Sequence, residues 1–291
     1  MSEYAIELKG VSYTYGKGTP FMKLAVDHVD LNIRRGIITG IIGHTGSGKS
    51  TLLQMMNGLL RPQEGTVLLD GKDVWEKPGK IREIAFRVGL VFQYPEYQLF
   101  EETVRKDVSY GPKNMGLSDA EIERRVKEAL AFVGIGEELY DASPFDLSGG
   151  QKRRVAIAGV IAMEPEVLIL DEPAAGLDPR GRAEIFGNIV NYKEKTGRTV
   201  IIVSHSMDDM ARYAEETAVL CGGRAVMMDE TKKVFSAGRE TLEKLGLNVP
   251  QITLLMEKLA QMGLPVSKDV FTVEEAKREL LPLLKGGQSD A

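Results

Sequence analysis

A glycine-rich stretch at residues 43–51 constrains the fold of this chain more than any other feature of its sequence. It reads Gly-His-Thr-Gly-Ser-Gly-Lys-Ser-Thr and fits the phosphate-binding pattern G-x-x-x-x-G-K-[ST]. The apolar run at residues 37–42 precedes it, as a buried parallel strand would, and residues 50–58 read as a helix that ends at Gly58. A strand, a glycine loop and a helix in this order predict a phosphate-binding loop on an α/β fold rather than an ordinary glycine-rich turn.

The residue types explain how such a loop holds a polyphosphate. Glycine lets the backbone curl with its N–H groups turned inward, and the helix N-terminus adds a partial positive charge. We expect Lys49 to reach the outer phosphates and the Ser50 hydroxyl to bind Mg²⁺. The predicted nucleotide contacts of this loop are Gly43, His44, Thr45, Gly46, Ser47, Gly48, Lys49, Ser50 and Thr51.

Length and composition narrow the classes of protein. With 291 residues, 43% of them hydrophobic, the chain can bury a substantial core, as one large α/β domain or as one domain with an appended tail. Its one cysteine, Cys221, excludes an internal disulfide and favours a reducing compartment. We expect no signal peptide, and no apolar run approaches the ~18 residues of a membrane span, so any membrane role should go through a partner. The net charge of −5 argues against a large nucleic-acid surface.

The first third of the chain outside the loop reads as strands. Alternating apolar residues predict antiparallel strands between residues 5 and 33, with a turn at residues 11–18 that carries Tyr13 and Tyr15. Residues 65–72 read as a strand that enters an Asp-Gly turn. Residues 88–92 form a further apolar strand that ends at Gln93.

Helical patterns dominate most of the remainder. A short, polar helical insert is expected at about residues 95–147, where a capping box at Ser118 and Glu121 begins one helix. Further helices are expected after Ser148 and around residues 183–195, with strands at residues 167–170 and 199–203 between and after them. After about residue 237 come helices at residues 252–262 and 272–284, the second with a capping box at Thr272, and a tail from residue 285 that we expect to be disordered.

Alternation of buried strands and helices predicts a parallel sheet covered by helices, in which ligands bind beyond the carboxyl ends of the strands. Gly43, Gln93, Asp171 and His205 each follow a different apolar strand. We therefore expect these residues to converge at one edge of the sheet.

The polar residues at these strand ends suggest the chemistry of phosphate transfer. Asp171 follows four apolar residues and suits Mg²⁺, and Glu172 is the natural general base for a water that attacks the γ-phosphate, although two such acids can simply cap the next helix. Gln93 is predicted to contact Mg²⁺ or the attacking water, against the alternative of a solvated loop residue. His205 is predicted to contact the γ-phosphate, against the alternative of a structural histidine.

A second glycine-rich stretch, Leu-Ser-Gly-Gly-Gln at residues 147–151, is the next most distinctive. Ser148 can cap a helix, and Gly149 and Gly150 leave the N-terminal amides open to an anion. The alternative is a plain serine cap with a flexible approach. The residues alone predict a second anion site without saying whose anion it binds.

Taken together, these motifs resemble the nucleotide-binding subunit of ATP-binding-cassette (ABC) transporters over roughly residues 4–238. The resemblance implies a P-loop ATPase fold with a mixed sheet, an antiparallel β subdomain, a helical subdomain at about residues 95–147 and a small helical extension at residues 238–291. It also implies a head-to-tail dimer, in which ATP lies between the phosphate loop of one subunit and Ser148, Gly149 and Gly150 of the other. Asp178 of a Gly-Leu-Asp motif would lie at the dimer seam, and Tyr15, with Tyr13 as its competitor, would stack on adenine.

Two finer features resemble one branch of this family. The Gly-His-Thr-Gly start of the loop and the segment at residues 92–104 are similar to the second ATPase subunit of energy-coupling factor importers and to cobalt-importer ATPases. In that branch the segment after the glutamine forms a short helix in the groove for the transmembrane coupling protein. Tyr97, Leu99 and Phe100 are the matching apolar positions, with core packing as the alternative.

The resemblance implies an ATPase, bound at the cytoplasmic face of the membrane, that uses ATP and Mg²⁺ to power uptake of a vitamin or a transition-metal ion. Its partners would be a transmembrane coupling subunit, a substrate-binding membrane subunit, and either a paralogous ATPase or a second copy of itself. The rival hypotheses are the ATPase of a conventional ABC transporter and a soluble ABC ATPase that acts on DNA or ribosomes. The single cassette and the short helical insert weigh against the soluble class.

Overall fold

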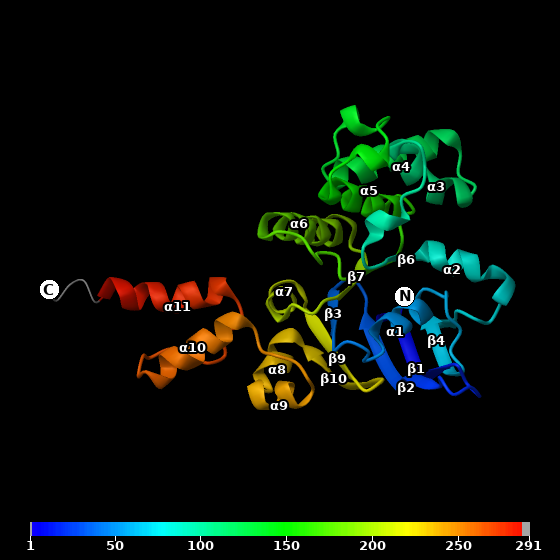
Figure 1. Cartoon of the computed structure of the whole chain (residues 1–291). Helices are drawn as coiled ribbons and strands as arrows, with labels where there is room; N and C mark the ends of the chain where they lie inside the picture. Colours follow the sequence, from blue (N-terminus) through cyan, green and yellow to red (C-terminus); the bar gives the residue numbers. More distant parts are fainter. Residues whose placement is uncertain (1, 287–291) are drawn as a thin grey trace.

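The computed structural model describes residues 2–286, and a six-stranded sheet forms its centre (Figure 1). The strand order is β10-β9-β3-β8-β7-β6, in which β10 runs antiparallel to β9 and the other pairs are parallel. The strands are β3 (Ile38–Ile42), β6 (Val88–Val91), β7 (Val167–Asp171), β8 (Thr199–Val203), β9 (Glu216–Cys221) and β10 (Arg224–Glu230). The predicted strands of this sheet are confirmed, whereas β9 and β10 were not anticipated.

A second, four-stranded antiparallel sheet has the order β2-β1-β4-β5. Its strands are β1 (Tyr4–Tyr15), β2 (Lys23–Arg34), β4 (Glu64–Leu69) and β5 (Lys72–Asp73). The turn predicted at residues 11–18 is wrong in its first half, because β1 continues to Tyr15 and pairs Val11 with Val29. The alternation of buried and polar residues outweighs the local turn signals there, and the chain turns only at Gly16, whose φ is +59°.

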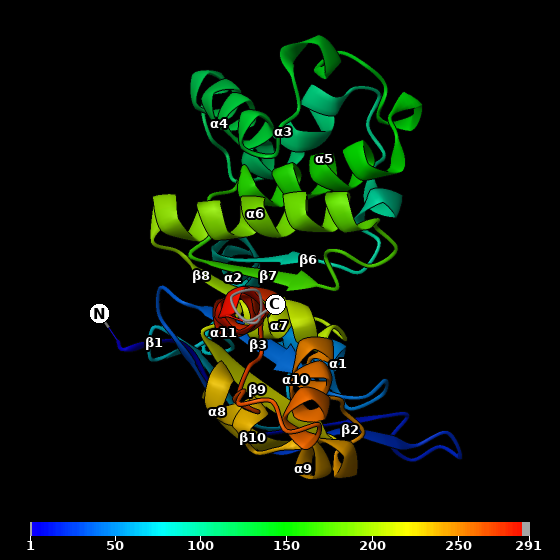
Figure 2. The ribbon, with the colours of Figure 1, turned by 90° about the vertical axis from the view of Figure 1, so that its left-hand side faces the viewer.

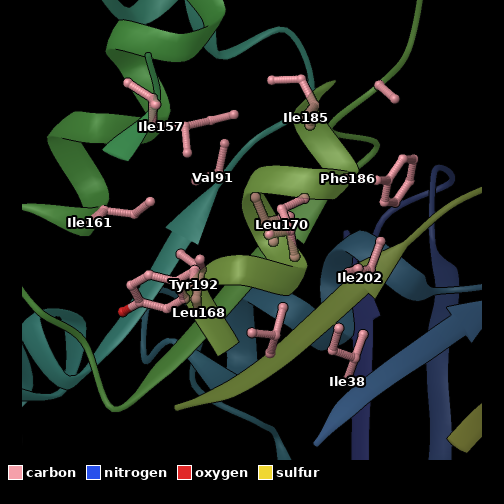
Figure 3. Close-up of a cluster of buried hydrophobic side chains, with 14 of the residues drawn as sticks. Ile38, Val91, Ile157, Ile161, Leu168, Leu170, Ile185, Phe186, Tyr192 and Ile202 are labelled. Carbon is pink, nitrogen blue, oxygen red and sulfur yellow. The ribbon is translucent and has the colours of Figure 1, made fainter. Parts of the chain in front are cut away.

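The two faces of the central sheet belong to different hydrophobic cores. Ile41, Ile169 and Ile201 pack with the antiparallel sheet and with helix α1 (Lys49–Met56). Their neighbours on the opposite face pack against the helical layer, and Figure 3 shows Ile38, Leu168, Leu170 and Ile202 on the strands near Ile157, Ile161, Ile185, Phe186 and Tyr192 of the helices. This two-sided burial explains why the strands read as continuous apolar runs.

Helices of the middle region form a layer that stands above this sheet in Figure 2. They are α3 (Val104–Asn114), α4 (Asp119–Phe132), α5 (Gly149–Ile161) and α6 (Pro179–Thr196), with the short 3₁₀ turns η2 (Pro95–Gln98), η3 (Glu137–Leu139) and η4 (Pro144–Asp146). The turn η1 (Pro78–Lys80) and helix α2 (Ile81–Arg87) precede β6, and Ile84 of α2 packs with the core of the antiparallel sheet instead. Helix α6 begins four residues before its predicted start because Asp178 caps it and Pro179 suits its first position. The capping box predicted at Ser118 forms only in part: Ser118 accepts the N–H of Glu121, but the Glu121 carboxylate binds Arg124 and Arg125 instead.

The last part of the described chain holds five further helices. Helices α7 (Met207–Tyr213), α8 (Thr231–Ser236) and α9 (Arg239–Lys244) lie beside the central sheet, whereas α10 (Gln251–Gln261) and α11 (Val273–Gly286) extend away from the sheets in Figure 1. The capping box of Thr272 and Glu275 is confirmed. Helix α11 runs to residue 286, so the disorder predicted from residue 285 is wrong for its first two residues, and residues 287–291 lie outside the described part.

Helices α10 and α11 share a small core of Met256, Val270 and Ala276, separate from the two main cores. A boundary at residue 237 between the ATPase domain and the extension stays a prediction, because Leu242, Leu247 and Val249, which follow it, still belong to the main core. Between residues 2 and 286, the chain holds no helix with the length and apolar content needed to cross a bilayer.

Candidate functional site

The predicted convergence at one edge of the sheet is confirmed. A hollow of about 200 Å³ lies there, lined by Thr45, Gly46, Gly48, Lys49, Ser50, Thr51, Gln93, Asp171, Glu172 and His205. A larger hollow of about 360 Å³ lies against α4 and α6 and carries none of these residues, so size alone does not locate the site. The strand ends bring together phosphate-loop amides, two carboxylates, an ammonium and an imidazole.

The phosphate loop is closely packed against its own chain. A Cβ on Gly43 would lie 2.4 Å from the Leu220 carbonyl oxygen, and one on Gly48 would lie 2.3 Å from that of Ala25. Gly48 also has a φ of +101°, which only glycine adopts readily. The loop conformation therefore depends on glycine at both positions.

Lys49 is held across the loop. Its Nζ donates to the carbonyl oxygens of Gly43 at 2.6 Å and His44 at 3.1 Å. The side chain is buried, and this burial lowers the pKa of Lys49, while the nearby Glu172 and Asp171 carboxylates oppose the shift. A desolvated ammonium at this place interacts strongly with phosphate charge.

Ser50 and Asp171 form the oxygen pair that suits Mg²⁺. The Ser50 hydroxyl donates to Asp171 Oδ2 at 3.0 Å, and burial raises the pKa of Asp171 against the opposing effects of Ser50 and Lys49. Mg²⁺ is usually held by one or two carboxylates together with substrate phosphates and waters. The residues fit that pattern: Gln93 lines the same hollow, and no cluster of three or more His, Cys, Asp or Glu side chains that could form an all-protein cage occurs among residues 2–286.

Glu172 has the features expected of a general base. Its φ is +52°, an uncommon conformation for a residue with a side chain, and its N–H donates to the Val203 carbonyl. Its side chain is 12% exposed, and the buried Oε1 has no hydrogen-bond partner in the described part of the chain. Burial, and then the Asp171 carboxylate, raise the pKa of Glu172 to about 7, although Lys49 works against the shift. A carboxylate with a free oxygen and a near-neutral pKa is suited to accept a proton from water.

His205 lies beside this carboxylate. Its Nε2 is 3.5 Å from Glu172 Oε1, and half of its side chain is exposed to the hollow. Burial, and then the Lys49 charge, lower the pKa of His205. The histidine is therefore placed to contact a group that enters between Lys49 and Glu172.

The two candidate adenine-stacking tyrosines occupy different environments. Tyr15 is 41% exposed, and its hydroxyl lies 3.2 Å from Thr51 Oγ1 on α1. Tyr13 packs against the core and meets Tyr15 edge-on, with ring centroids 4.9 Å apart. The geometry favours Tyr15 because an open ring face is required for stacking.

The helical extension touches the phosphate loop at His44. A Cβ on Gly246 would lie 3.6 Å from the Cβ of His44, and the imidazole Nδ1 lies 2.9 Å from the carbonyl oxygen of Thr45. Sequence reasoning treated both loop residues as marks of lineage. No pattern in the sequence points to this packing, since it joins segments about two hundred residues apart.

The second glycine-rich stretch lies outside the hollow. Ser148, Gly149 and Gly150 are exposed, and Ser148 caps α5 in a capping box with Gln151. The predicted cap is confirmed, while the anion site stays a prediction. Asp178, also exposed, caps α6 by accepting the N–H of Gly181.

Buried Arg153 is an element of the site that sequence reasoning missed. It forms a two-contact ion pair with Glu96 at 3.0 and 2.7 Å and donates to the carbonyls of Pro173 and Ala175. It therefore joins α5, the segment after Gln93 and the loop after Glu172. A possible signal was its position one turn before Ile157, on a buried face of α5.

The structure decides between the two alternatives for the apolar positions after Gln93. Leu99 is only 7% exposed and belongs to the main core, whereas Tyr97 and Phe100 are 84% and 58% exposed. Core packing is therefore the correct alternative for Leu99 alone.

Comparison with known proteins agrees with this geometry. The family model for ABC transporters matches residues 26–175. The energy-coupling factor transporter ATP-binding proteins EcfA2 of Clostridium tetani and Symbiobacterium thermophilum are 52% and 53% identical to the chain, covering 96% and 97% of it and 97% of each relative.

Solved structures of similar proteins have the same fold. The structure of cbiO1 from Clostridium perfringens, described as part of the ABC transporter complex cbiONQ, aligns with a TM-score of 0.74 and 43% identity, covering 88% of this chain and all of that one. A dimeric cassette, MJ0796, bound to ADP and phosphate after hydrolysis, aligns with a TM-score of 0.70 and 30% identity over 78% of this chain and 98% of its own. The fold, the strand-end residues and this similarity along nearly the whole length agree: the chain belongs to the ABC transporter family, among the ATP-binding proteins of energy-coupling factor transporters.

Proposed function

We propose that this chain is the ATP-hydrolysing subunit that powers an energy-coupling factor transporter for a vitamin or a transition-metal ion. The observation that carries the proposal is the arrangement at the sheet edge, where the free oxygen of Glu172 and the imidazole of His205 face the phosphate loop and Lys49. ATP binding follows from the family, and the hydrolytic roles rest on this geometry.

The nucleotide contacts follow from the positions of the side chains. Adenine would stack on Tyr15, and the loop amides of residues 43–51 would surround the phosphates, with Lys49 against the outer ones. Ser50, Asp171 and Gln93 would hold Mg²⁺, which neutralises phosphate charge when bound. Glu172 would take a proton from the attacking water, and His205 would donate to the γ-phosphate.

A second subunit would complete the site. Ser148, Gly149 and Gly150 present an open helix N-terminus, and Asp178 lies exposed at the start of α6. We propose that these residues act in trans, across a head-to-tail dimer with a paralogous ATPase or with a second copy of the chain. The dimeric ATPase neighbour with ADP and phosphate supports such an arrangement.

The membrane partners would be a transmembrane coupling subunit and a substrate-binding subunit, and the chain would lie at the cytoplasmic face of the membrane. The cbiONQ complex named for the structural neighbour supports a multi-subunit assembly. We propose that two exposed residues contact the coupling subunit: Tyr97, within the 3₁₀ turn η2, and Phe100, which follows it.

Replacement of Glu172 by Gln tests the hydrolytic role. Loss of the base should lower ATP hydrolysis by about 10²- to 10⁴-fold while ATP binding persists, and ATP-bound dimer should accumulate. Glu164→Gln is a matched control, since Glu164 also has a positive φ (+53°) but lies outside the hollow. Normal turnover by Glu172→Gln would disprove the base assignment.

The pH dependence gives an independent test of the same residue. Because Glu172 must be deprotonated to act as a base, kcat/KM should rise with pH through about 7 and level off above it. The residual activity of Glu172→Gln should lack this rise. A wild-type profile already flat from pH 5 to 8 would contradict the raised pKa.

A further inference from the structure

Lys23 is a cation beside the phosphate loop to which the residue assignments above give no role. It is the first residue of β2, and the β1–β2 register pairs it with Tyr15. Its Nζ lies 3.9 Å from the position that a Cβ on Gly46 would occupy. The ammonium therefore lies at the exposed tip of the loop, on the strand whose backbone pairs with the proposed adenine-stacking residue.

The Lys23 ammonium has no ion-pair partner in the described part of the chain. Between residues 2 and 286 no carboxylate lies within ion-pair distance of its Nζ, whereas Lys9 on β1 pairs with Glu7 at 3.1 Å. Gly46 next to it is exposed and has a φ of +83°, so its backbone is open to a ligand. An unpaired ammonium turned toward a loop of inward-facing amides is complementary to an anion.

Lys23 and Lys49 approach the loop from different sides. Lys49 is buried and held by the carbonyls of Gly43 and His44, whereas Lys23 is exposed and reaches Gly46 from the neighbouring sheet. We expect a nucleotide whose base stacks on Tyr15 and whose phosphates enter the loop to lie between the two. Its phosphate chain would then have a cation on the solvent side as well as on the buried side.

We propose that Lys23 is a further nucleotide-binding residue, which contacts the phosphate chain of ATP or ADP from the solvent side. This inference rests on the proposed function, because it requires the nucleotide to lie in the loop with its base on Tyr15. Lys23 contributes to affinity and to the preference for di- and triphosphates over uncharged ligands, and it takes no part in the proton transfer.

The test compares nucleotide binding by the full-length Lys23→Ala and Lys17→Ala variants, measured by titration calorimetry at low and high salt. Lys17 is the matched control, because it lies in the turn of the same hairpin but does not come within 4 Å of a Cβ on Gly46 as Lys23 does. Loss of one partly exposed charge–charge contact should weaken ATP and ADP by about five- to tenfold at low salt and less at high salt. Adenosine binding should not change, and Lys23→Arg should stay close to wild type. Lys23→Met, which keeps the aliphatic stem, should reproduce the loss if packing is not the cause.

Unchanged ATP affinity of both neutral variants would overturn the inference, as would an equal loss for Lys17→Ala. A loss that extends equally to adenosine would also overturn it, because the effect would then act through Tyr15. Failure of the folded wild-type chain to bind ATP would instead refute the proposed function.

Discussion

Two glycine-rich stretches, each leading into a helix N-terminus, occupy opposite environments in this molecule. In the phosphate loop, a side chain on Gly43 or Gly48 would collide with backbone of the same subunit. In the stretch at residues 147–151, a Cβ on Gly149 or Gly150 would meet nothing within 4 Å. The chain itself therefore requires glycine in the loop, whereas any requirement at residues 149–150 must come from outside the subunit.

The polar groups of the two stretches differ in the same way. Lys49 is already held by loop carbonyls before a ligand arrives, and Ser50 already contacts Asp171. Ser148 accepts the N–H of Gln151, and this leaves its own hydroxyl hydrogen free to donate. The side chains of the phosphate loop are therefore preorganised, whereas the second stretch exposes hydrogen-bond donors that have no partner in the described part of the chain.

The largest expected effect on ATP hydrolysis comes from a negative charge placed in the second glycine-rich stretch. Gly150→Asp should lower ATP hydrolysis by about 10²-fold or more, since a carboxylate would face the phosphate that the second stretch is proposed to bind. ATP affinity of the isolated subunit should persist, and so should stability, because an acidic residue in the first turn of α5 suits the helix dipole. Hydrolysis assays beside nucleotide titrations check both expectations.

Lys49→Ala is the corresponding substitution in the phosphate loop, and it should abolish ATP binding itself. Equal loss of ATP affinity in Gly150→Asp and Lys49→Ala would remove the distinction between the two stretches.

Much of the phosphate-loop region could be predicted from the sequence, because the signals that specify it are local. A strand, a glycine loop and a helix specify the geometry of residues 37–58, and apolar strands that end in polar residues place Asp171 and Glu172 beside it. The convergence of Gln93 and His205 followed from the parallel topology alone.

What could not be predicted depends on contacts between distant segments. The ion pair of Arg153 with Glu96 and the packing of Gly246 on His44 leave no periodic trace in the sequence. The continuation of β1 through Val11 to Tyr15 was missed because local turn residues were weighed without the pairing to β2. The position of Leu99 stayed open because one apolar residue in a short turn can face either the core or solvent.

Alanine substitutions in the two glycine-rich stretches should change the free energy of unfolding in opposite directions. Gly43→Ala should destabilise the subunit by about 3 kcal/mol, because its Cβ would overlap the Leu220 carbonyl and Ser47 Oγ. Gly150→Ala should instead stabilise it by roughly 0.5 kcal/mol, since alanine favours the helix and the surrounding space is open. Urea unfolding of the nucleotide-free variants measures both signs. Two changes of the same sign and size would show that the environments do not differ as described.

The smallest expected effect is on nucleotide affinity, and it tests whether the isolated subunit binds nucleotide through the phosphate loop and Tyr15. Tyr15→Ala should weaken ATP and adenosine binding to the isolated subunit by about tenfold, because an exposed stacking surface is lost. Tyr15→Phe, which removes only the contact with Thr51 Oγ1, should bind nearly as wild type, and Tyr13→Ala should lower stability more than affinity, since its ring packs on the core. If Tyr13→Ala weakened binding more than Tyr15→Ala, the adenine would lie on the inner ring. If neither did, the base would be held elsewhere, and the phosphate-loop half would need its dimer partner even to bind ATP.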